Sequence, residues 1–134
     1  MAYDLTKKLR LQHKIIKKIL NDIQTLTNSN SESTTEISEK LKSFRKILVE
    51  HIHMENKVLY PKIFKNLEND RMGIKSINIL LSEMKKIEEK TISFLNKYNN
   101  SKIKLSQFKT DLDEVSHLLT TRIKLEDECV MQYW

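Results

Sequence analysis

The sequence has very few of the residues that break helices or build tight turns. Its 134 residues include one glycine and one proline, far below average usage. β-Sheets need turns that depend on these two residues, so their scarcity predicts an all-α protein. At this length we expect a single domain over residues 1–134, with a core that needs no disulfide.

Cysteine and long apolar runs are scarce as well. The one cysteine cannot form an internal disulfide, which fits a reducing compartment. No apolar run approaches the length of a membrane span, and the first residues lack the apolar segment of a secretory signal. We therefore expect a cytoplasmic protein with no membrane partner.

The charge is unbalanced but dispersed. Lys and Arg number 24 against 18 Asp and Glu, for a net charge of +6. The lysines are spread along every segment, are mixed with acidic residues, and form no basic block among aromatic residues. This pattern is typical of a solvated lysine-rich surface, so we expect no nucleic-acid partner.

Apolar residues recur at helical spacing in four segments, residues 5–23, 37–59, 77–94 and 105–123. The Ser and Thr residues of the polar run 28–35 are expected N-caps, and residues 99–101 are expected to open the fourth helix. Pro61 is expected to kink the second helix or to mark its last turns, and a turn is expected near residues 70–73. Long helices with short connections predict an up-down-up-down antiparallel four-helix bundle.

The two halves of the sequence are similar at an offset of 71 residues. Residues 51–63, HIHMENKVLYPKI, align with residues 122–134, RIKLEDECVMQYW. The same offset aligns the apolar positions of the earlier helices and places Glu55 on Glu126. The bundle is therefore predicted to consist of two copies of one helical hairpin.

Histidine and glutamate share the core-facing side of the second helix. His51 and Glu55 are one turn apart, and a buried carboxylate is costly unless it is paired or bound to a metal. His13 lies on the core side of the first helix, and the repeat turns Glu126 inward. Two imidazoles and two carboxylates are a plausible set of ligands for iron or manganese. The alternative is a surface His–Glu pair worth a few tenths of a kcal/mol.

The pattern H-x-x-x-E-N-x-x-L-Y-P, from His51 to Pro61, resembles the signature helix of hemerythrin-like (HHE cation-binding) domains. HIHMENKVLYP is also similar to the helix of iron–sulfur cluster repair di-iron proteins, and LQHKIIKKI around His13 resembles the family's first ligand helix. The resemblance covers essentially the whole chain. It implies a non-haem di-iron site bridged by Glu55 and Glu126, with both histidines on one iron. It also implies a protein that binds oxygen, senses nitric oxide or holds iron.

The sequence departs from the family in its second half. The repeat places Met84 and Arg122 at the positions that match the two histidines, where family members carry histidines for the second iron. The stretch LLSEMKKI, residues 80–87, lacks the usual histidine. Glu83 and Glu88 are nearby, but neither replaces an imidazole at the matched position. The sequence therefore predicts a half-complete site.

Arg122 offers two interpretations of this site. Its guanidinium is always charged and has no lone pair for a metal, but it can form hydrogen bonds with Glu126 and Glu55. In the first interpretation, one iron is bound by His13, His51 and both glutamates, with Arg122 behind them. In the second, no metal binds and Arg122 is the counter-ion of the two carboxylates.

The remaining candidate residues have simpler expected roles. His53 and His117 are expected at the surface, since each is turned away from the core side of its helix. Cys129 aligns with Val58 in the repeat and is expected to point inward as a small apolar residue.

Three classes of function follow from these features. The first is a hemerythrin-like iron protein that binds a diatomic ligand such as oxygen or nitric oxide, as a monomer or homodimer. The second is a metal-free bundle that acts as a regulatory or protein-interaction module. The third is an oxidase or peroxidase with a mononuclear site, which is least favoured because the sequence shows no general acid or base beyond the expected ligands.

Overall fold

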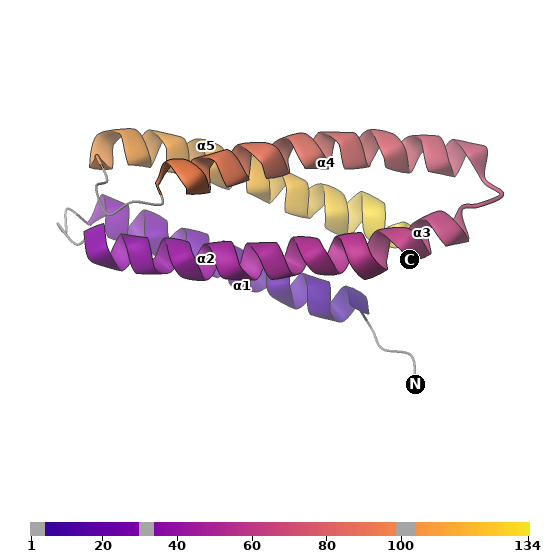
Figure 1. Cartoon of the computed structure of the whole chain (residues 1–134), viewed down its shortest axis with the longest axis horizontal. Coiled ribbons are helices and arrows are strands. Elements are labelled where there is room, and N and C mark those ends of the chain that lie inside the picture. The colour runs from indigo at the N-terminus through magenta and orange to yellow at the C-terminus, as the bar shows by residue number, and fades with distance from the viewer. Residues whose placement is uncertain (1–4, 30–33, 99–103) are drawn as a thin grey trace.

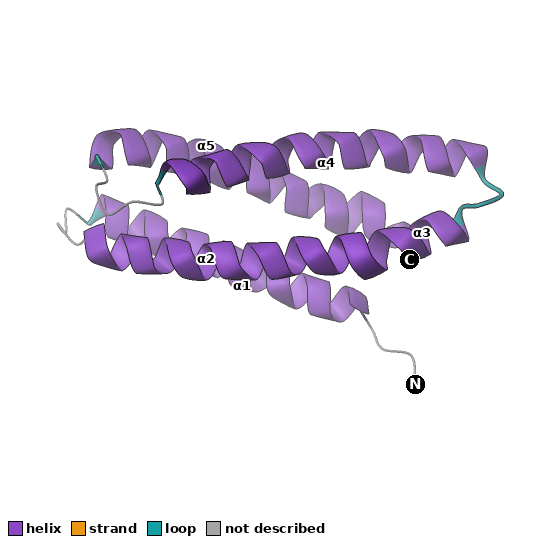
Figure 2. Ribbon diagram, in the orientation of Figure 1, coloured by secondary structure: helices purple, strands orange, loops and turns teal. Residues whose placement is uncertain are grey.

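The computed structural model describes residues 5–29, 34–98 and 104–134, which are helical apart from short turns and contain no strand (Figures 1 and 2). None of the helices in these ranges is long and apolar enough to span a membrane. The elements are α1 (Leu5–Asn28), α2 (Thr34–Met54), η1 (Glu55–Leu59), α3 (Tyr60–Asn66), α4 (Arg71–Lys97), α5 (Leu105–Leu125), η2 (Glu126–Val130) and η3 (Met131–Tyr133).

These elements form four long helical rods. The first is α1 and the third is α4, while α2, η1 and α3 run on as the second, and α5, η2 and η3 as the fourth. In Figure 1 the α1–α2 pair lies below the α4–α5 pair, and each hairpin packs along its length. The all-α, antiparallel four-helix bundle predicted from the sequence is confirmed.

The turn expected at residues 70–73 is one of two details that the structure corrects. Asp70 caps α4 by accepting a hydrogen bond from the Gly73 N–H at 2.9 Å, so Gly73 belongs to the first helical turn. A Cβ atom at Gly73 would lie 2.7 Å from Asp70 Oδ2, and this crowding favours glycine there. Pro61 lies in α3, the last element of the second rod, as expected for a proline that marks the last turns. The N-caps expected at residues 30–33 and the helix start at 99–101 lie outside the described residues.

Two apolar clusters fill the interior of the bundle. The larger one contains Phe44, Phe94 and Phe108, and the smaller one contains Leu9 and Leu59. Along each rod the two clusters occupy opposite ends, and buried polar side chains of α1, α2, η1, α5 and η2 fall between them. The polar groups therefore form a belt across the bundle with dry, packed layers above and below it.

Both halves of the chain contain a π-helical turn at the same place in the repeat. η1 begins at Glu55 and η2 at Glu126, and in each turn the N–H five residues on donates to the carbonyl of that glutamate. Pro61 follows the first turn, but its counterpart in the second half is Gln132, so proline is not the common cause. What the two turns share is a buried glutamate at their first residue, and π turns are frequent at functional sites.

The second correction concerns Cys129, whose predicted inward orientation is wrong. Cys129 is partly exposed, and its counterpart Val58 is 42% exposed. Leu59 and Val130, one residue further on, are fully buried in their place. The wider π turn explains the difference, because it carries the residue four positions after each glutamate back over the core side.

Candidate metal centre

The polar belt is built from single residues on several elements and is closed to solvent. α1 contributes two residues, α2 one, η1 one, α5 one and η2 one, and each side chain is at most 7% exposed. Polar groups in such a place need partners. The six are Gln12, His13, His51, Glu55, Arg122 and Glu126.

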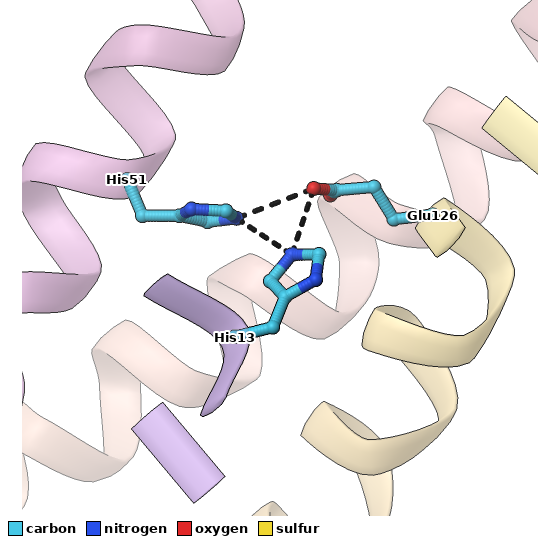
Figure 3. Close-up of side chains that lie close together, drawn as sticks. All are labelled: His13, His51 and Glu126. Atoms are coloured by element: carbon cyan, nitrogen blue, oxygen red, sulfur yellow. Dashed lines mark hydrogen bonds and ion pairs between the residues drawn. The ribbon is translucent and has the colours of Figure 1, made fainter. Parts of the chain in front are cut away.

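Three atoms of the belt that could act as metal ligands point at one another (Figure 3). His13 Nε2 lies 3.0 Å from His51 Nε2 and 2.9 Å from Glu126 Oε1, and His51 Nε2 lies 3.3 Å from the same oxygen. Metal–ligand bonds of about 2.1 Å at right angles separate neighbouring ligand atoms by about 3.0 Å. The triangle therefore has the size of one face of a metal coordination shell, with the two-histidine, one-carboxylate composition of non-haem iron sites.

The far sides of the two imidazoles explain why their Nε2 atoms can act as ligands. His13 Nδ1 lies 2.9 Å from Asp127 Oδ1, and His51 Nδ1 lies 2.7 Å from Gln12 Oε1. Both partners are acceptors, so each Nδ1 carries the proton and each Nε2 presents a lone pair. Metal-binding histidines typically have such a second partner, which fixes the ring and its tautomer.

The three converging atoms are all acceptors. Burial lowers the pKa of His51 below its ordinary value, against the opposing effect of Glu126, so this ring is neutral near pH 7. Two lone pairs and a carboxylate oxygen that face one another in a dry interior repel unless a cation or a proton lies between them. The donor set therefore fits a metal ion.

Glu55 lies at the edge of the triangle and is held from its other side. Its Oε1 atom is 3.3 Å from His51 Nε2 and 3.2 Å from Arg122 Nη2, while Tyr60 O–H donates to its Oε2 at 3.3 Å. Glu55 is fully buried. Its carboxylate therefore connects His51 to the guanidinium, and among the described residues Glu126 does not take that bond.

Burial is the largest single influence on the pKa of each carboxylate, yet the two pKa values shift in opposite directions. Burial and the neighbouring Glu126 raise the pKa of Glu55 well above its usual range, although Arg122 and Tyr60 oppose the rise. Burial also acts to raise the pKa of Glu126, but in the metal-free protein hydrogen bonds from Glu55 and both histidines hold that pKa below its ordinary value. Such a bond from a histidine needs a proton on Nε2, and a bound cation would take the place of that proton. Two carboxylates this close favour sharing a proton, and a bound cation would favour ionising both.

The repeat reappears in the contacts, with an imidazole in one half and a guanidinium in the other. The contact between His51 and Glu126 at 3.3 Å is matched, at the offset of 71 residues, by the contact between Arg122 and Glu55 at 3.2 Å. Met84, the counterpart of the first histidine, is buried, and its carbonyl lies 3.5 Å from Arg122 Nη1. The second half of the site thus holds a guanidinium where the first half holds two imidazoles.

The other candidates fall outside the triangle. Glu88 Oε2 lies 3.7 Å from Arg122 Nη1, whereas Glu83 is exposed and pairs with Lys86. His53 and His117 are exposed. Sequence reasoning did not single out Gln12 or Asp127. Their only signal was that they are next to His13 and Glu126 in the sequence, and this signal is weak because neighbouring residues in a helix point in different directions.

The model of the family described as hemerythrin HHE cation binding domain matches residues 4–134, nearly the whole chain. The chain belongs to the hemerythrin family. No curated protein and no solved structure matches it. In this hemerythrin domain, the buried cluster of two histidines and a glutamate is the group of described residues that could hold the cation for which the family is named. The similarity to iron–sulfur cluster repair proteins stays a prediction from the helix motif.

Proposed function

We propose that this hemerythrin domain binds one non-haem iron ion and, through it, a small diatomic ligand such as oxygen or nitric oxide. His13, His51 and Glu126 are its ligands, and the carboxylate of Glu55 is a fourth candidate ligand at the edge of the site. The observation that supports this most is the triangle of 2.9–3.3 Å between three acceptor atoms whose protons lie elsewhere.

Each residue of the belt has a separate task in this proposal. Asp127 and Gln12 hold the two rings in the orientation that aims Nε2 at the centre. The apolar clusters on both sides exclude water, which strengthens every electrostatic contact inside. Iron, once bound, supplies an electron-rich centre with open positions for a small ligand.

Arg122 is the reason for proposing one ion instead of two. It occupies the repeat position of His51 and already neutralises Glu55. A second dication next to a fixed guanidinium is unfavourable in a site with low dielectric. In this chain the guanidinium replaces the second metal of the family's di-iron centre.

The single Arg122–Glu55 pair also favours a second candidate function. If the guanidinium balances Glu55 while the two histidines hold Glu126, the bundle needs no metal and acts as a regulatory or protein-interaction module. A catalytic role stays the third and least favoured possibility, and manganese is the alternative metal. We place the protein in the cytoplasm, where reducing conditions keep iron in the ferrous state.

Metal content per chain tests the proposal. The protein is reconstituted anaerobically with ferrous iron, or with manganese, then desalted and analysed by mass spectrometry of the metal. We expect about one iron per chain in the wild type and none in Glu126→Gln, because the variant loses a charged ligand. The exposed Glu83→Gln is the matched control and should retain the iron.

The outcomes separate the candidates. Two irons per chain would show that Arg122 does not occupy the second position, and no retained metal would leave the metal-free module. For a protein with one iron, ultraviolet–visible spectra recorded with oxygen and then with nitric oxide identify which diatomic molecule binds.

A further inference from the structure

A pocket of about 240 Å³ opens beside the half of the site that lacks histidines. It lies between the second rod and α4, and Arg122 of α5 is part of its wall. Pockets that hold drug-sized ligands have volumes of roughly 300–1,000 Å³, so an occupant here must be smaller. The side chains that matter for its chemistry are those of Asn56, Lys85, Glu88 and Arg122.

Two positive charges line this pocket. Arg122 is 5% exposed and belongs to the inner wall, whereas Lys85 is exposed on α4. Lys85 forms no ion pair with any residue in the described parts of the chain. The exposed amide of Asn56 adds a further polar group. The pocket therefore carries more positive than negative charge where a small molecule can enter.

Arg122 is well bonded on one side only. Its Nη2 atom has a close acceptor in Glu55 Oε1 at 3.2 Å. For Nη1 the acceptors are the Met84 carbonyl at 3.5 Å and Glu88 Oε2 at 3.7 Å, both beyond the usual 2.7–3.2 Å of an N–H···O bond. A buried guanidinium edge with only long contacts can gain from a closer acceptor.

Glu88 shows which chemistry suits this edge. Its side chain is 29% exposed and reaches the guanidinium loosely, while Glu55 on the opposite side is fully buried. A free carboxylate in the pocket can approach Nη1 more closely than a side chain that is tied to α4. It can also contact Lys85 at the same time.

We propose that this pocket binds a small free carboxylate anion between Arg122 Nη1 and Lys85, in competition with Glu88. The pocket adjoins the metal centre, and binding there does not depend on a bound metal. Arg122 connects the two, because the same guanidinium holds Glu55 next to His51.

A nuclear magnetic resonance titration of the metal-free, ¹⁵N-labelled full chain tests this site. Acetate is the probe, and sodium chloride at equal ionic strength controls for screening. We expect saturable shifts of the Arg122 Nε–Hε signal and of the backbone amides of residues 56, 85 and 88, with acetate only. Shifts that do not saturate, or that chloride reproduces, would overturn the proposal.

Two substitutions on α4 give opposite expected effects. Lys85→Gln should weaken acetate binding about three- to tenfold, because it removes a charge-assisted contact at an exposed position. Glu88→Gln should tighten binding about threefold by removing the competing carboxylate. Lys86→Gln and Glu83→Gln make the same charge changes on the same helix, outside this pocket, and should leave the affinity within twofold. Equal effects in these controls would show a bulk charge effect and refute the site.

Discussion

Removing the charge of Arg122 tests how the second half of the site is held together. In Arg122→Gln, Glu55 stays fully buried without its cation, and Glu126 is 1% exposed beside it. Charges separated by 3.2 Å attract by about 5 kcal/mol at an effective dielectric constant of about 20, and removing one partner of a buried pair typically costs about 3–5 kcal/mol. We expect the free energy of unfolding of the metal-free protein to fall by about 3 kcal/mol.

Urea unfolding followed by circular dichroism at pH 8, in the presence of a chelator, measures this loss, since the raised pKa of Glu55 favours its neutral form at lower pH. Arg45→Gln removes an exposed arginine that contacts Asn96 and should cost less than about 0.5 kcal/mol. The double variant Arg122→Gln, Glu55→Gln should recover at least half of the loss, since no buried charge is left alone. A loss below about 1 kcal/mol, or additive effects in the double variant, would refute the role of Arg122 as the cation that balances the buried Glu55.

Three further predictions follow from the belt and the core. Asp127→Ala should weaken iron binding about 10- to 100-fold, measured by chelator competition, while the exposed Asp113→Ala should not; equal affinities would contradict a role in orienting the ring. The pKa of Glu55 is raised in the folded state, so its contribution to stability is complete below about pH 4.5 and is lost as pH rises. In urea titrations between pH 5 and 8, the metal-free wild type should therefore lose stability relative to Glu55→Gln. Parallel stability curves for the two proteins would contradict the raised pKa. Phe108→Ala should lower the free energy of unfolding by about 3–5 kcal/mol, because the ring is fully buried between Phe94 and Tyr98; a loss near 1 kcal/mol would mean that the core closes around the gap.

The repeat that relates the two halves of the site was visible in the sequence. Which glutamate Arg122 contacts was not. The offset of 71 residues placed Arg122 on His51 and Glu55 on Glu126, and the structure repeats these relations as two contacts of similar length. Sequence reasoning paired Arg122 first with Glu126, one helical turn away, and named Glu55 as an additional partner, whereas in the structure Arg122 contacts Glu55. The choice of Glu55 depends on side-chain packing across the two hairpins, which no spacing along one helix encodes.

The π turns are the clearest structural feature that periodicity could not predict. A pattern of apolar residues assumes a constant angle per residue, so it extended the α-helix through Glu55 and Glu126 and turned Cys129 inward. One extra residue in each turn was enough to bury Val130 instead. Each turn begins at a buried glutamate with contacts to other helices, and such contacts are not part of local helix propensity.

The sequence by itself determined the helical class, the four rods, the repeated hairpin and, outside the two π turns, most of the residues that face the core. It could do so because scarce Gly and Pro, and apolar residues spaced by one helical turn, act locally along each helix. Only the tertiary structure decided that His13, His51 and Glu126 meet within 3.3 Å, and that Gln12 and Asp127 fix the two rings. These contacts join residues on three helical rods, so their geometry exists only when the apolar clusters above and below have packed.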